Sequence, residues 1–543
     1  MKRSIGRLCH AGRLFLSLLF IASVAARAQT APPDPHAQHR NTGTEQKKDG
    51  QEKAPDRKPG KEPDKVMDHT AHDDPHAGHM AHAGHANVNG MMYTLSGGPF
   101  RSMKAMGSGT ALQPATTPMY GWHQMPGGWM LMTHMALKAG YNHQGGYRGV
   151  GKAVSQNWLM TMAEHHVGRG RLMLRGMLSA EALTVPHGGV PQLFQTGETY
   201  RNRGIIDAQH PHDVFMEMAA SYTLPVGERI SLHVYGGPVG EPALGPVAFM
   251  HRLSAMDNPA VPLAHHWQDS THITHGVITG GLTISRVRLE MSTFHGREPD
   301  ENRVGLDMGR LDSFSWRVSW LPGANWALQY SEGFLRNPEA LYAGDTRKRT
   351  ASLMWNRPLG QGNIAAAVVW GRNRELHGVS NSYLAEAALN FRRKNYIYFR
   401  GELLDKQGLL EDNIYGRAGL ICQRFKPAPN GRGGVSQPEA SPGTVVLCNP
   451  RTPPAPPAQN VVFHGAPPDT PSRVYPVLIF NQWFRVGALT LGGVRDLIAN
   501  DRMKIGLGAD VTIYRQPAAL NPIYGTQTRS WQAFVRFRPA EMK

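Results

Sequence analysis

The sequence predicts an all-β protein: a transmembrane antiparallel β-barrel of about 14–16 strands, preceded by a signal peptide and a disordered periplasmic tail rich in histidine and methionine. Three observations predict the barrel. Candidate strands run about 9–12 residues, which suits a tilted bilayer crossing. Short turns alternate with long loops along the chain, as in outer-membrane barrels. Tryptophans gather near the ends of candidate strands, as an interfacial girdle requires.

The first residues predict export. Basic residues between Lys2 and Arg13 precede an apolar stretch, residues 14–26, and Ala26-Arg27-Ala28 offers a small-x-small cleavage site. This stretch is shorter than the roughly 20 residues of a spanning helix, which argues against an N-terminal membrane anchor. We therefore expect residues 1–28 to be a signal peptide that is removed. Because no later apolar run reaches that length, a membrane position requires a barrel.

Residues 29–127 are predicted to form a disordered tail that binds metal ions. They lack apolar periodicity and are rich in charged residues, proline, glycine and methionine. Imidazole is a good ligand for divalent copper, zinc and nickel, whereas thioether selects Cu(I), so the mixture favours copper. The alternatives are compositional drift in a linker and a pH-sensitive tail without metal. The expected tail ligands are closely spaced: Met67, His69, His72, His76, His79, Met80, His82 and His85.

Two short stretches of this tail resemble a known family. Met67-Asp68-His69 and His76-Ala77-Gly78-His79-Met80, together with the order signal, tail and barrel, resemble the outer-membrane copper-resistance proteins of type B. The resemblance covers the tail and not the barrel, so another barrel family of metal-resistance loci is an alternative. It implies a protein of the bacterial outer membrane whose N-terminal tail lies in the periplasm. Its expected partners are outer-membrane lipid, the metal ion and periplasmic copper-handling proteins.

Residues 128–543 are predicted to form the barrel. Apolar and polar residues alternate, as where Phe314 and Trp316 alternate with Ser315 and Arg317, so each set lies on one face of a sheet. A secreted β-sandwich array or propeller is the alternative. Sixteen candidate strands lie near residues 129–138, 156–165, 170–181, 213–224, 228–236, 272–285, 286–295, 312–321, 324–332, 349–357, 362–371, 382–391, 395–404, 478–495, 503–514 and 529–538.

The predicted connections hold two further features. Long loops are expected near 182–211, 237–271, 296–311 and 406–473, and short turns near 225–228, 322–325 and 359–362. Cys422 and Cys448 fall in the last long loop of an exported chain, where we expect a disulfide. Loop histidines offer a second metal site from His210, His212, His265, His266 and His272. Solvated loop or girdle histidines are the alternative, and His275 is expected to face the lumen.

Sequence patterns exclude several function classes. The chain has no H-E-x-x-H, G-x-S-x-G or P-loop motif, so we do not expect an enzyme. Export and the lack of a clustered basic helix argue against nucleic acid as a partner, despite a formal net charge of +17. Two functions remain. One is the handling or export of a transition metal, copper above all, by tail and barrel. The alternative is a general or solute-specific porin with an incidental tail.

Overall fold

The computed structural model describes residues 103–542, apart from residues 186, 202, 340–343, 377, 411–412 and 416 and most of 418–482. The signal peptide and the tail ligands from Met67 to His85 lie outside the described residues, so the expectations made for them stay predictions. No helix among the described residues has the length and apolar character needed to cross a membrane.

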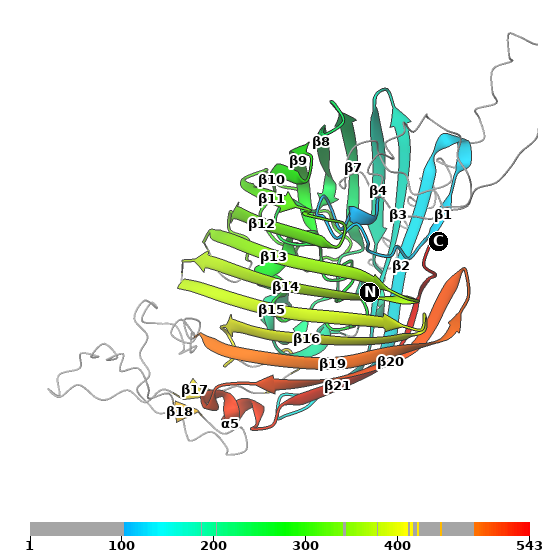
Figure 1. The fold of residues 1–543 in the computed structure, drawn as a ribbon. Helices are drawn as coiled ribbons and strands as arrows, with labels where there is room; N and C mark the ends of the chain where they lie inside the picture. The colour runs from blue at the N-terminus through cyan, green and yellow to red at the C-terminus, as the bar shows by residue number, and fades with distance from the viewer. Residues whose placement is uncertain are drawn as a thin grey trace, which may run out of the picture. The chain divides into compact units, whose positions relative to one another are not determined.

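The described residues form a closed antiparallel β-barrel (Figure 1). Each strand pairs with its neighbour along the chain, and the last strand returns to the first with Leu137 opposite Phe537. Within the described part of the chain, sixteen strands make this barrel: β2 (Met130–Gln144), β3 (Gly151–Val167), β4 (Gly170–Leu178), β7 (Phe215–Pro225), β8 (Ile230–Gly240), β9 (Thr274–Ile284), β10 (Val287–Phe294), β11 (Ser313–Trp320), β12 (Trp326–Leu335), β13 (Thr346–Leu359), β14 (Gly362–Glu375), β15 (Gly378–Phe391), β16 (Asn395–Lys406), β19 (Phe484–Ala499), β20 (Met503–Arg515) and β21 (Arg529–Pro539).

The predicted barrel is thus confirmed, and each predicted strand range overlaps one observed strand. A short additional strand, β1 (Trp122–Gln124), pairs with the beginning of β2, along the part of its edge that β21 does not reach. An isolated bridge between Tyr120 and Glu541 lies at the same end of the barrel.

Connections alternate in length around the barrel, as predicted. One end carries tight turns, such as residues 168–169, 285–286 and 360–361. The other end carries the long loops, which contain α2 (Glu181–Thr184), the hairpin β5 (Val190–Tyr200) and β6 (Arg203–Gln209), α3 (His265–Gln268), η4 (Ser270–His272), η5 (Ala518–Leu520) and α5 (Asn521–Tyr524). We call the two ends the turn end and the loop end.

Side chains on the barrel wall have the reverse of a soluble protein's distribution. On β11, Phe314 is 56% exposed and Trp320 47% exposed, whereas Ser315 and Arg317 are each 1% exposed. The outer face of β11 is therefore apolar and aromatic, and its inner face is polar. Alternation with this polarity is typical of strands that face lipid on one side and a polar lumen on the other.

Two segments fill much of the lumen. The first, residues 103–121, is called here the lumenal segment and contains η2 (Met103–Ala105). Arg175 of β4 donates to the carbonyl of Gly109 at 2.6 Å, and Arg317 of β11 donates to Thr110 Oγ1 at 2.7 Å. The second, residues 241–273, connects β8 to β9 and is called the inserted loop. Most of its side chains are buried, and Ala248 N donates to Ser108 Oγ of the lumenal segment at 2.8 Å.

The predicted boundary of the disordered tail at residue 127 is wrong. Residues 103–127 are ordered, because wall arginines bind the backbone of the lumenal segment and its apolar side chains are buried. Ala105 and Leu112 pack with Val247 of the inserted loop. The first barrel strand, β2, begins at Met130, shortly after these ordered residues.

The expected disulfide is not established. Cys422 belongs to β17 (Ile421–Cys422), where it lies opposite Val446 of β18 (Val446–Leu447). Cys448 lies outside the described residues, so the pairing of the two cysteines stays a prediction.

Candidate functional site

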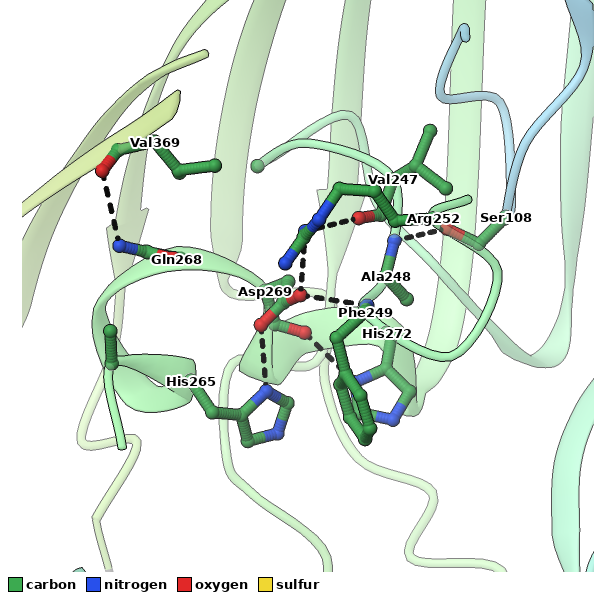
Figure 2. Close-up of polar contacts among 12 residues, drawn as sticks. Ser108, Val247, Ala248, Phe249, Arg252, His265, Gln268, Asp269, His272 and Val369 are labelled. Carbon is green, nitrogen blue, oxygen red and sulfur yellow. Dashed lines mark hydrogen bonds and ion pairs between the residues drawn. The ribbon is translucent and has the colours of Figure 1, made fainter. Parts of the chain in front are cut away.

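The inserted loop is held in the lumen by buried ion pairs. Arg252 Nε lies 2.5 Å from Glu386 Oε1 of β15, and its Nη1 lies 3.3 Å from Asp269 Oδ2 within the loop. Figure 2 shows Asp269 at the centre of this network, where it also accepts a hydrogen bond from Phe249 N at 2.9 Å. These groups are almost fully buried, so the charges interact in a poorly screened environment. The loop therefore has one defined position against the barrel wall.

Three histidines gather around this anchor. His265 Nδ1 donates to Asp269 Oδ1 at 2.7 Å, and His272 Nδ1 donates to the Asp269 carbonyl at 2.8 Å (Figure 2). His212, which precedes β7, donates from Nδ1 to Glu181 Oε2 at 2.8 Å. The ring centres of His265 and His212 lie 5.1 and 5.4 Å from that of His272. We call these three residues the histidine cluster.

The orientation of these rings suits metal binding. Metal-ligating histidines typically bind the ion through one nitrogen and donate the other N–H to a carboxylate or carbonyl. The Nε2 of His272 is buried without a hydrogen-bond partner. Burial lowers the pKa of His265, and burial with the neighbouring histidines lowers the pKa of His272 further. Both rings are therefore neutral near pH 7, which is the protonation state that a metal ligand needs.

The carboxylate beside them stays charged. Burial alone would raise the pKa of Asp269, but the hydrogen bond from His265 and the charge of Arg252 outweigh burial and lower it below its usual value. A carboxylate that keeps its charge fixes the tautomer of His265 and leaves Nε2 as the basic nitrogen.

Two groups of described residues, neither of which includes the histidine cluster, bring their ligand atoms within 4.8 Å of one another. Asp213, His275 and Asp307 form one, and His266, Glu298 and Glu339 form the other. Both nitrogens of His275 are buried without hydrogen-bond partners, although Arg303 lies 3.1 Å from Asp213 and competes with a cation for that carboxylate. Both groups lie at the loop end and mix imidazole with carboxylate.

The structure divides the five histidines predicted for a loop site. His212 and His265 meet near His272, whereas His266 lies in the separate group with Glu298. His210 lies in none of these groups, and its ring contacts the carbonyl of Pro211. The alternative of solvated loop histidines is wrong for the histidine cluster, because the inserted loop folds inward and buries it. The expectation that His275 faces the lumen fits its 0% exposure.

Sequence reasoning missed the carboxylates of these groups, above all Glu181 and Asp269. Asp269 lies four residues after His265, a spacing that places the two on one face of a helical turn. Glu181 lies 31 residues from His212, and nothing local links the two.

Comparisons with known proteins do not assign this chain to a family. No protein-family model and no curated protein matches the chain. Among solved structures it is similar to an anion-selective porin from Comamonas acidovorans, with 9% identity over 75% of this chain and 99% of that one and a TM-score of 0.41. It is also similar to OprB of Pseudomonas putida, with 9% identity over 76% of this chain and 94% of that one and a TM-score of 0.42. Likenesses this low carry no information about what passes through this barrel.

Proposed function

We propose that the chain is a porin-like barrel of the bacterial outer membrane that admits small polar or charged solutes through its lumen. The observation that carries the proposal is the polarity of the closed wall, which is apolar outside and carries many charged and hydroxyl side chains inside. Folding would not favour such an outer face in water, because it leaves large apolar side chains exposed.

The lumen also suits selection rather than free diffusion. Charged wall residues of both signs face inward, and the lumenal segment and the inserted loop bind them from within. A constriction lined by fixed charges and hydrogen-bonding groups selects solutes by size and charge. We therefore expect a small conductance that depends on how firmly these two segments are held.

Conductance tests this function. The purified full chain is reconstituted in planar bilayers and compared with an Arg252→Gln variant, in which the inserted loop loses its ion pairs to Glu386 and Asp269. We expect discrete conductance steps from the natural chain and larger or noisier steps from the variant. Arg347→Gln is the matched control, because Arg347 is 51% exposed and its loss leaves the lumen unchanged. If neither the natural chain nor Arg252→Gln conducts any ion, the channel is rejected.

A second candidate function is the handling of a transition metal, copper above all. The observation that favours it is the histidine cluster, in which buried imidazoles are oriented by carboxylates and a carbonyl at the loop end of the lumen. On this proposal the tail ligands from Met67 to His85 collect the ion in the periplasm, where copper-handling proteins are its partners, and the barrel anchors the tail or conducts the ion.

Metal titration tests the second candidate. The full chain is titrated with Cu(II) and compared with a His265→Gln/His272→Gln variant, which is expected to bind one ion fewer. His143→Gln is the control, because His143 lies on the outer face of β2 against Trp531. Equal numbers of bound ions in all three proteins would reject a site at the histidine cluster.

A further inference from the structure

One part of the lumenal wall is rich in methionine sulfur. Inward positions on β11 are Ser313, Ser315, Arg317 and Ser319. The corresponding positions on β2, β3 and β4 carry buried methionines instead. Register places Met132 opposite Met162 and Met160 opposite Met177, so thioethers from adjacent strands lie side by side.

The lumenal segment and the inserted loop add methionines to this region from inside the barrel. Met103 and Met106 come from the lumenal segment, and Met250 comes from the inserted loop. A cavity lies between them and the wall, lined also by Met160 and Met162. We call it the methionine chamber. Three parts of the chain that are distant in sequence thus direct thioethers into one space.

An unsatisfied imidazole also lines the chamber. His134 of β2 lies opposite Met160, and its Nδ1 contacts the carbonyl of Tyr120 at 2.7 Å. Its Nε2 is buried and has no hydrogen-bond partner. A buried polar atom without a partner typically costs about 1–3 kcal/mol. A metal ion at Nε2 would satisfy it.

We propose that the methionine chamber binds a soft monovalent metal ion, Cu(I) or Ag(I), through His134 Nε2 and the thioethers of Met160 and Met162, with further thioethers from Met103 and Met250. This inference deepens the metal-handling function and rests on it. Thioether is a soft, uncharged ligand that selects Cu(I) over harder divalent ions. The side chains of Lys138, Arg175 and Arg538 also line the chamber, and their positive charges disfavour a divalent ion more than a monovalent one.

The test uses the full-length chain with the eight tail ligands, Met67 to His85, and also His36, His39, Met91 and Met92 changed to serine, so that the histidines and methionines before the lumenal segment contribute no ions. This protein is titrated anaerobically with Cu(I) against a chromophoric chelator, and in parallel with Ag(I). We expect one tightly bound ion. Met160→Leu/Met162→Leu should weaken its binding on the order of 10- to 100-fold, a loss typical when even a supporting group of a metal site is removed. Leucine keeps the volume and apolar character, so the barrel should still fold.

Met354→Leu is the matched control. Met354 is also buried, 4% exposed, and packs against the same lumenal segment, but it lies on β13 away from the chamber. An unchanged affinity in the double variant, or no bound ion in the tail-substituted chain, would overturn the proposal. If the double variant fails to fold, X-ray absorption of the Cu(I)-loaded tail-substituted chain decides: sulfur scatterers support the chamber, and a shell of only nitrogen and oxygen rejects it.

The outcome is separable from those of the proposed functions. Conductance measures the channel without any soft metal, and Cu(II) titration measures the histidine cluster. A chain that conducts but binds no Cu(I) leaves the channel intact and removes the chamber. A chain whose Cu(I) binding depends on Met160 and Met162, but which does not conduct, supports the chamber and rejects the channel.

Discussion

Replacing Arg317 with methionine should release the lumenal segment and destabilise the barrel. Arg317 joins four parts of the protein. It belongs to β11, its Nε lies 3.0 Å from Glu290 Oε2 of β10, its Nη1 donates to the carbonyl of Gly245 in the inserted loop at 3.2 Å, and its Nη2 donates to Thr110. Both members of the ion pair have fully buried side chains.

Two separate losses follow from this substitution. Glu290 loses its buried ion-pair partner and keeps His233, 3.1 Å away, and the charge of Arg288; breaking a buried pair costs about 3–5 kcal/mol. The lumenal segment also loses its bond to Thr110. A hydrogen bond to a charged group contributes about 1.5–3 kcal/mol, so local opening of the segment should become about 10- to 100-fold more frequent.

The first loss is measured as the free energy of unfolding in urea, and the second as the rate of trypsin cleavage after Lys104 in the folded barrel. A double variant, Arg317→Met/Glu290→Gln, separates the two. It should recover stability, because no orphan charge remains. It should keep the fast cleavage, because Thr110 still lacks its partner. Unchanged cleavage in both variants would refute the view that Arg317 holds the segment, and Arg347→Gln serves as the surface control, with an expected effect below about 1 kcal/mol.

Three further predictions concern the wall and the lumen. A Cβ at Gly140 of β2 would lie 2.0 Å from the carbonyl oxygen of Ala533, so Gly140→Ala should destabilise barrel closure by about 1–3 kcal/mol. Gly280→Ala is the control, because a Cβ there meets open space. The heat-dependent mobility of the two variants in SDS gels measures the difference. Val368 is 57% exposed in the middle of β14 and faces lipid on our proposal, so Val368→Lys should lower the free energy of unfolding in vesicles by about 2–4 kcal/mol. The same change at Val226, which lies in a turn, should have little effect, and equal effects at the two positions would argue against a bilayer. Burial raises the pKa of Glu241 to about 8, although Arg317 opposes the shift. A raised folded-state pKa gives stability that is present below pH 4.5 and is lost as the pH rises through about 8. Glu241→Gln should remove that decline in urea unfolding between pH 5 and 8.5, and a persistent decline would show that another group is responsible.

The wall of the barrel is predictable from sequence because its information is local. Each strand alternates over ten or so residues, and a single β11 already shows apolar residues on one face and serines with arginine on the other. Errors are confined to strand ends, as for β13, which begins three residues before its predicted start and ends two after its predicted end. Pairing then follows from sequence order, since each barrel strand lies beside the next one along the chain.

The contents of the lumen are not predictable in the same way. The lumenal segment has no apolar period, and its order comes from Arg175 and Arg317, which are 66 and 207 residues from their partners in it. The histidine cluster depends on a loop that turns inward because Arg252 meets Glu386, 134 residues away. Sequence identified His212 and His265 as metal-binding residue types, but only the fold brings them together, and it assigns His266 to another group.

The uneven use of methionine inside the barrel is the strongest indication that the chamber is more than packing. Methionine fills irregular gaps well, so a methionine-rich core can arise wherever a flexible segment meets a wall. The lumenal segment provides an internal control, because it also packs against the far side of the barrel. There its buried neighbours are alanine, leucine and valine, with Met354 the single methionine of eight described residues in the cluster. On the side of β2 to β4, nine of fifteen are methionine. Since the same segment packs with a single thioether on one side, packing alone does not require nine on the other, and an unsatisfied His134 nitrogen lies beside them.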